Sequence, residues 1–268
     1  MMWVTTERRL RAIRSVALSV VTVLFVCSSS WAQSALTVAA AANLGPALRE
    51  ISAQFEKQSG IHVALVFGSS GNLTTQIEHG APYDVFLSAN MSYPEQLAKE
   101  GLAEPESLRR YAVGKLVLWA KKDSHIDLDH LGERSLLAPE VRRIAIANPV
   151  HAPNGTAAMK YLKAANVYDQ LKDKLVMGED VAQAAQFVIS GNAQIGIIPL
   201  SLALAPNMVA TGRYHPLPKT APSVEQGAIV ITRSANQSVA EKFLEFMKSP
   251  DAVVTLRRYG YEVPEAKP

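Results

Sequence analysis

The chain has 268 residues, 27 of them basic and 24 acidic, and a formal net charge of +3 at pH 7. This near balance excludes the strong basic field with which proteins bind nucleic acids or acidic membranes. The single cysteine excludes a disulfide framework. A chain of this length can bury a sufficient core without such crosslinks, so we expect one large domain or two lobes and no nucleic-acid partner.

The first 32 residues have the composition of a secretory signal peptide. Four arginines and one glutamate lie within residues 1–14, an uncharged and mostly apolar run covers 15–27, and the small residues Ser30 and Ala32 follow. This order predicts export and cleavage after Ala32. A membrane anchor is the alternative, but it needs about 20 apolar residues, and this run is well short of that.

Removal of residues 1–32 changes the charge and the cysteine content. The segment takes with it four basic residues, one acidic residue and Cys27, which is the only cysteine. The mature protein is therefore expected to be close to neutral, without a disulfide or thiolate chemistry. Lipid attachment at Cys27 is an alternative, although the bulky Val26 before it fits such a site poorly.

Short apolar runs alternate with helical patterns along the rest of the chain. Apolar residues recur on one helical face from Leu44 to Phe55, and Gly60 ends that helix. This regular alternation predicts an α/β fold with mostly parallel sheets flanked by helices, without an internal repeat or a low-complexity linker. The expected strands cover residues 36–40, 61–67, 83–87, 113–120, 143–147, 195–198 and 228–232.

Four strand-to-helix junctions contain small and amide residues and no cationic side chain. They cover residues 40–44, 68–72, 152–156 and 179–182. The start of a helix exposes unpaired N–H groups at the positive end of the helix dipole, and small residues let an anion approach them. Several such starts that converge would bind an oxyanion without arginine or lysine. Plain capping is the better interpretation of any single junction, because Asn and Ser are ordinary N-cap residues.

The last of these junctions contains two acidic residues. Glu179 and Asp180 would repel an anion, so we expect their carboxylates to point away and to cap the helix.

A serine enzyme with Ser70 as nucleophile is a rival hypothesis. The sequence lacks the G-x-S-x-G pattern of a nucleophile elbow, and no histidine and acid are placed to complete a triad. We therefore expect a protein that is not an enzyme, with no catalytic residue and no cofactor.

Taken in chain order, these junctions resemble the periplasmic molybdate-binding proteins of ABC importers, a family of solute-binding proteins. The resemblance implies a two-lobed periplasmic binding protein fold of type II, with the ligand in the cleft between the lobes. It implies one lobe from residues 33–115 together with 226–268, and a second lobe from 116–225. The motifs that carry it are AAANL at 40–44, GSSG at 68–71, QIEHGAPYDVFLSA at 76–89, NP at 148–149 with APNG at 152–155, EDV at 179–181 and RYGY at 258–261.

The same resemblance implies a set of ligand residues, one junction at a time. They are Ala42, Asn43, Ser70, Asn154 and Val181. Ala42 and Val181 would contribute backbone N–H groups. Pro199 stands where some relatives have a tyrosine hydroxyl, and Asn43 stands where many have serine, so the coordination of the fourth oxygen stays open.

The chemistry of the anion fits a site that contains only donors. Molybdate and tungstate are fully deprotonated tetrahedral dianions whose oxygens only accept hydrogen bonds, whereas protonated phosphate would also need an acceptor. Sulfate and thiosulfate suit the same donors, and a sequence does not specify the cavity size that would separate them. The resemblance implies a periplasmic monomer that binds molybdenum as its oxyanion, without direct protein–metal ligands, and delivers it to the membrane permease of an ABC importer.

Overall fold

The computed structural model describes residues 35–264, which lie within one compact unit. The expected signal peptide at residues 1–32, including Cys27, lies outside the described residues. No helix in the described part of the chain is long and apolar enough to cross a membrane.

The described residues form ten strands. They are β1 (Leu36–Ala41), β2 (Val63–Gly68), β3 (Val85–Ser88), β4 (Arg109–Gly114), β5 (Leu116–Lys121), β6 (Ile144–Ala147), β7 (Leu175–Gly178), β8 (Ile195–Pro199), β9 (Gly212–Pro216) and β10 (Val224–Val230). The α-helices are α2 (Gly45–Ser59), α3 (Ser70–Glu78), α4 (Ser92–Lys99), α5 (Leu128–Leu131), α6 (Pro153–Ala164), α7 (Tyr168–Leu171), α8 (Val181–Ile189), α9 (Leu200–Ala203), α10 (Pro206–Thr211), α11 (Gln237–Phe246) and α12 (Pro250–Arg258). Four short 3₁₀ helices are η1 (Ala42–Leu44), η2 (Pro105–Ser107), η3 (Gly132–Leu137) and η4 (Lys172–Lys174).

The strands form two five-stranded sheets, with the orders β2-β1-β3-β10-β4 and β7-β6-β8-β5-β9. Both sheets are mixed, which corrects the expectation of mostly parallel sheets. Strands β1, β2 and β3 are parallel to one another, as are β6, β7 and β8. The chain passes from one sheet to the other between β4 and β5 and returns between β9 and β10. Strands β5 and β10 then pair antiparallel with both of their neighbours.

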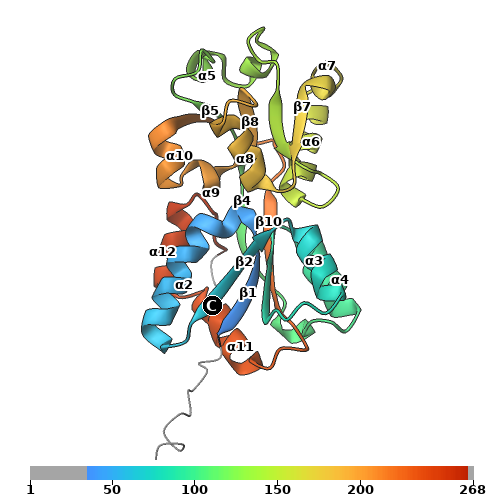
Figure 1. Ribbon diagram of the computed structural model, residues 1–268, viewed down its shortest axis with the longest axis vertical. Coiled ribbons are helices and arrows are strands. Elements are labelled where there is room, and N and C mark those ends of the chain that lie inside the picture. The colour runs from blue at the N-terminus through green and yellow to red at the C-terminus, as the bar shows by residue number, and fades with distance from the viewer. Residues whose placement is uncertain (1–34, 265–268) are drawn as a thin grey trace, which may run out of the picture. The chain divides into compact units, whose positions relative to one another are not determined.

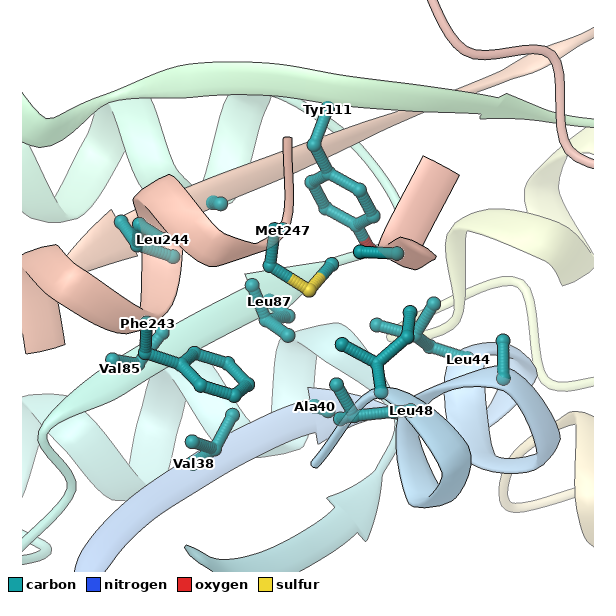
Figure 2. Packing of buried hydrophobic residues seen from close by; sticks show 14 of the residues in the cluster. Val38, Ala40, Leu44, Leu48, Val85, Leu87, Tyr111, Phe243, Leu244 and Met247 are labelled. Carbon is teal, nitrogen blue, oxygen red and sulfur yellow. The ribbon is translucent and has the colours of Figure 1, made fainter. Parts of the chain in front are cut away.

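Both faces of the first sheet are buried, because alternate residues of each strand point to opposite sides. Val38 and Ala40 of β1 pack in the core formed with α2, α11 and α12. Ala39 points to the other face, where α3 and α4 cover the sheet. Figure 1 shows these two groups of helices on opposite sides of the strands. Figure 2 shows Phe243, Leu244 and other core side chains packed over the first face of the sheet.

The second sheet is covered in the same way. Leu116 and Leu118 of β5 pack with residues of α5, α6 and α7, whereas Val117 and Trp119 pack with residues of α8, α9 and α10. Trp119 is completely buried. Both sheets therefore present the carboxyl ends of their parallel strands as fixed platforms for the loops that follow.

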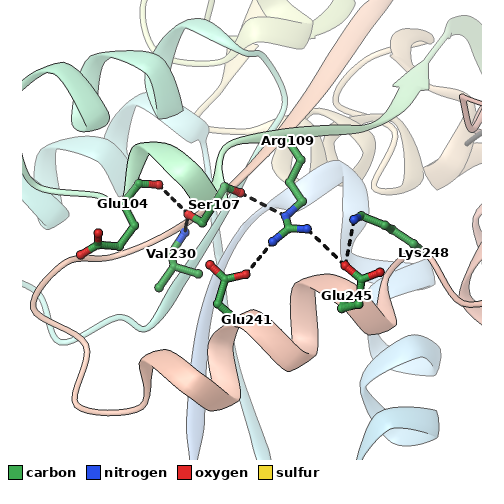
Figure 3. Close-up of polar contacts among 7 residues, drawn as sticks. All are labelled: Glu104, Ser107, Arg109, Val230, Glu241, Glu245 and Lys248. Carbon is green, nitrogen blue, oxygen red and sulfur yellow. Dashed lines mark hydrogen bonds and ion pairs between the residues drawn. The ribbon is translucent and has the colours of Figure 1, made fainter. Parts of the chain in front are cut away.

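A polar network joins the start of β4 to α11 (Figure 3). The guanidinium of Arg109 donates to the carbonyl of Ser107 at 3.1 Å and contacts the carboxylates of Glu241 at 2.5 Å and Glu245 at 3.3 Å. The hydroxyl of Ser107 also accepts the N–H of Val230 at 2.8 Å. Because both carboxylates are largely exposed, water screens these ion pairs, and the network orients α11 more than it stabilises the fold.

Candidate functional site

The loops that follow five parallel strands meet at one small cavity. Strands β1, β2 and β3 lead to it from the first sheet, and β6 and β7 from the second. The cavity is lined by Ala41, Ala42, Asn43, Gly68, Ser69, Ser70, Ala89, Ala152, Pro153, Asn154, Asp180 and Val181. The five ligand residues expected from the sequence are all among them. No lysine, arginine or histidine is among these lining residues.

Ser70, the first residue of α3, offers its hydroxyl proton to the cavity. The side chain is buried, and its Oγ accepts the N–H of Ala89 at 2.9 Å. Because this contact uses Oγ as an acceptor, the hydroxyl proton is available to donate to a ligand. The backbone N–H of Ser70 has no acceptor within its own helix, since it belongs to the first turn.

Helix α6 leaves one free N–H group at its start. Pro153 has no N–H, and the N–H groups of Gly155 and Thr156 donate to the carbonyl of Ala152 at 2.8 and 3.0 Å. Asn154 stands between Pro153 and Gly155, and its N–H has no acceptor among residues 35–264. Asn154 is 5% exposed, so this N–H is in a region from which most water is excluded. The start of α6 therefore presents one backbone donor where the sequence predicts a ligand.

Helix α8 also leaves one backbone N–H group free at its start, in this case because a side chain caps the next residues of the helix. The Oδ1 atom of Asp180 accepts the N–H groups of Ala182 at 2.8 Å and Gln183 at 2.9 Å, which confirms its expected role as a helix cap. The carboxylate of Glu179 does not cap the helix as expected; it accepts a hydrogen bond from the side chain of Asn72. The N–H of Val181, the first residue of the helix, remains without an acceptor among the described residues.

The side chain of Asn43 has a role that local sequence did not indicate. Its amide nitrogen donates to Oε1 of Gln226 and to the hydroxyl of Tyr261, both at 2.9 Å. Gln226 in turn donates to the carbonyl of Val224 at 2.7 Å, which fixes the orientation of both amides. Both amide protons of Asn43 are thus used within the protein, so its side-chain amide is not available as the donor that the sequence predicts.

The network around Asn43 also holds the loop between β1 and α2. The hydroxyl of Tyr261 donates to the carbonyl of Asn43 at 3.0 Å, and the hydroxyl of Ser201 donates to the same carbonyl at 2.8 Å. Burial raises the pKa of Tyr261, so its hydroxyl stays a neutral donor over the physiological range. The RYGY motif at 258–261 contains this tyrosine, but nothing in its spacing indicates a contact with Asn43.

The start of α3 lies against the loop after β6 at Gly71. The N–H of Gly71 donates to the carbonyl of His151 at 2.8 Å. A methyl group at Gly71 would lie 2.8 Å from Cβ of His151 and 2.7 Å from the hydroxyl of Tyr93, closer than real Cβ atoms approach. The absence of a side chain at Gly71 therefore lets the start of α3 and the loop after β6 come into contact.

Replacement of Gly71 by alanine is expected to weaken ligand binding. Overpacking of this size costs about 1 to 3 kcal/mol, which corresponds to roughly a 5- to 150-fold loss of affinity. Titration calorimetry of Gly71→Ala measures the loss, and thermal unfolding of the ligand-free variant is the control for folding. An affinity equal to that of the unmodified protein would show that the two loops can separate without cost in the bound state.

The sequence of the chain matches a known protein family. Residues 36–262 match the family of bacterial extracellular solute-binding proteins. The chain is a member of this family. The match covers nearly all described residues. The likeness to a solved periplasmic binding protein structure confirms the expected two-lobed fold.

Relatives of this solute-binding protein include proteins that are named for molybdate. The molybdate-binding protein of Rhodobacter capsulatus is 37% identical over 228 residues, which are 83% of this chain and 86% of that protein. The solved structure of the Azotobacter vinelandii periplasmic molybdate-binding protein is 35% identical, covers 86% of this chain and 100% of its own, and superposes with a TM-score of 0.80. The sulfate-binding protein SubI of Mycobacterium tuberculosis is only 15% identical, covers 85% of this chain and 86% of its own with a TM-score of 0.73, and shares the fold alone.

Proposed function

We propose that this solute-binding protein captures molybdate, and also tungstate, in the cavity and delivers it to the permease of an ABC importer. One observation carries the proposal: helix starts from both sheets converge on a small cavity lined without a cationic side chain. The similarity to two molybdate-binding proteins over most of the chain supports the same ligand. These relatives are binding proteins, which favours binding over catalysis here.

The donors proposed for the anion are mostly backbone groups. They are the N–H groups of Ala42, Asn43, Ser70, Asn154 and Val181, together with the hydroxyl of Ser70. A dianion that only accepts hydrogen bonds can use all of them, and donors that are fixed in the folded state need little reorganisation when the anion binds. A buried cationic side chain would add its own desolvation cost, which these neutral groups avoid.

Sulfate or thiosulfate is the second candidate ligand, because each offers the same pattern of acceptors. The likeness to a sulfate-binding protein extends only to the fold and does not favour sulfate. We propose that cavity size selects the larger molybdate and tungstate ions. The protein is proposed to act as a periplasmic monomer after cleavage at Ala32, with lobes formed by residues 33–115 with 226–268 and by residues 116–225.

A competition experiment tests the proposed ligand. The purified mature protein is titrated calorimetrically with molybdate, tungstate, sulfate, thiosulfate and phosphate, each alone and then in the presence of molybdate. We expect molybdate and tungstate to compete for one site and the other anions to bind much more weakly. If sulfate or thiosulfate bound more tightly than molybdate, the proposed specificity would be wrong.

A further inference from the structure

Ser69 has a buried hydroxyl for which residues 35–264 provide no hydrogen-bond partner. The residue is 4% exposed and lines the cavity next to Ser70. Its Oγ is buried and has no hydrogen-bond partner among the described residues. Buried hydroxyl groups are almost always satisfied in native proteins, so this one requires an explanation.

The ordinary role of a serine at this position is not fulfilled. Ser69 is the N-cap residue of α3, and an N-cap serine normally accepts an N–H from the second or third residue of its helix. Here the side chain makes no cap hydrogen bond. The N–H of Gly71, the second helical residue, donates instead to the carbonyl of His151. Helix capping therefore does not account for the hydroxyl of Ser69.

Ser69 lines the cavity, which distinguishes its hydroxyl from most other unpartnered groups. Among the unpartnered buried side-chain atoms of residues 35–264, only those of Ser69 and Asn43 belong to residues that line the cavity. The atom of Asn43 is Oδ1, which only accepts hydrogen bonds and cannot bind a deprotonated oxyanion. The hydroxyl of Ser69 can donate, so it suits such an anion.

We infer that the hydroxyl of Ser69 is a further ligand of the bound oxyanion. This inference rests on the proposed function and adds a donor to the set expected from the sequence. The site needs one, because the side-chain amide of Asn43 is used by Gln226 and Tyr261, and Pro199 carries no hydroxyl. The hydroxyls of the adjacent residues Ser69 and Ser70 then supply the side-chain hydrogen bonds to the anion, and the remaining donors are backbone N–H groups.

The test combines ligand affinity with ligand-free stability in Ser69→Ala. Loss of a hydrogen bond to a charged acceptor lowers affinity for molybdate about tenfold or more. The melting temperature of the ligand-free variant stays the same or rises, because the substitution removes an unsatisfied polar group rather than a cap. Ser52→Ala is the matched control: Ser52 also has a buried, unpartnered hydroxyl, but it lies in α2 and does not line the cavity. This control should retain full affinity.

Three outcomes separate this inference from the proposed function. Full affinity in Ser69→Ala, together with a clear loss in Ser70→Ala, would overturn the role of Ser69 and leave the proposed function intact. A lowered ligand-free melting temperature that accounts for the weaker binding would also overturn it, since that result indicates a structural role. If the unmodified protein did not bind molybdate, the proposed function would fail, and the inference with it.

Discussion

Gly155→Ala is expected to destabilise the folded protein by about 3 kcal/mol and to abolish tight molybdate binding, the largest effect of any single methyl group at the site. A Cβ atom at this position would lie 2.1 Å from the carbonyl oxygen of Ala147 and 2.8 Å from its carbonyl carbon. Both are backbone atoms at the end of β6 and cannot rotate away. Helix α6 must therefore shift, and the N–H of Asn154 shifts with it.

Urea denaturation and calorimetric titration of Gly155→Ala measure the two effects separately. Gly45→Ala is the control, because the nearest atom to a Cβ at Gly45 is a ring carbon of Phe67 at 3.8 Å, an ordinary contact. Wild-type stability and affinity in Gly155→Ala would mean that the start of α6 does not pack against β6 as described.

Ser70→Ala is expected to lower both affinity and stability. Removal of a hydroxyl donor to a charged ligand costs about 1.5 to 3 kcal/mol, or roughly tenfold or more in affinity. The N–H of Ala89, which donates to Ser70 Oγ at 2.9 Å, also loses its acceptor. An unsatisfied buried N–H costs about 1 to 3 kcal/mol of stability. Titration calorimetry and thermal unfolding of the ligand-free variant measure the two losses.

The stability of the ligand-free variants distinguishes the two neighbouring serines. Ser70→Ala should lower the melting temperature, whereas Ser69→Ala should not, because only the hydroxyl of Ser70 has a partner among the described residues. If Ser70→Ala bound molybdate with unchanged affinity, the hydroxyl of Ser70 would serve only to hold Ala89.

Most local elements of the fold could be predicted from the sequence, but β4, β7, β9 and the directions of the strands could not. The apolar run at 36–40 and the helix that ends at Gly60 both correspond closely to β1 and α2. The antiparallel pairing of β5 and β10 could not be predicted, because it arises from the passage of the chain between two sheets. Strand direction within a sheet depends on contacts between distant segments, which periodicity does not report.

Contacts between distant segments also limited what could be predicted about single residues of the site. Small residues after strands identified all four junctions, because the start of a helix is a local feature. The true partners of Asn43 are Gln226 and Tyr261, which lie 183 and 218 positions away along the chain. The unpartnered hydroxyl of Ser69 was missed for a similar reason, since the N–H of Gly71 is taken by the distant His151. Which donors remain available to a ligand is decided by these long-range contacts.

The salt dependence of molybdate affinity shows whether the cavity holds a dianion with neutral donors alone. The lining residues include no lysine, arginine or histidine, and salt screens short hydrogen bonds to buried groups poorly. Calorimetric titrations from low to near-molar sodium chloride, with chloride tested separately as a competitor, should therefore show only a slight decrease in affinity. A steep decrease that chloride competition does not explain would show that a cationic side chain binds the anion and would contradict the account.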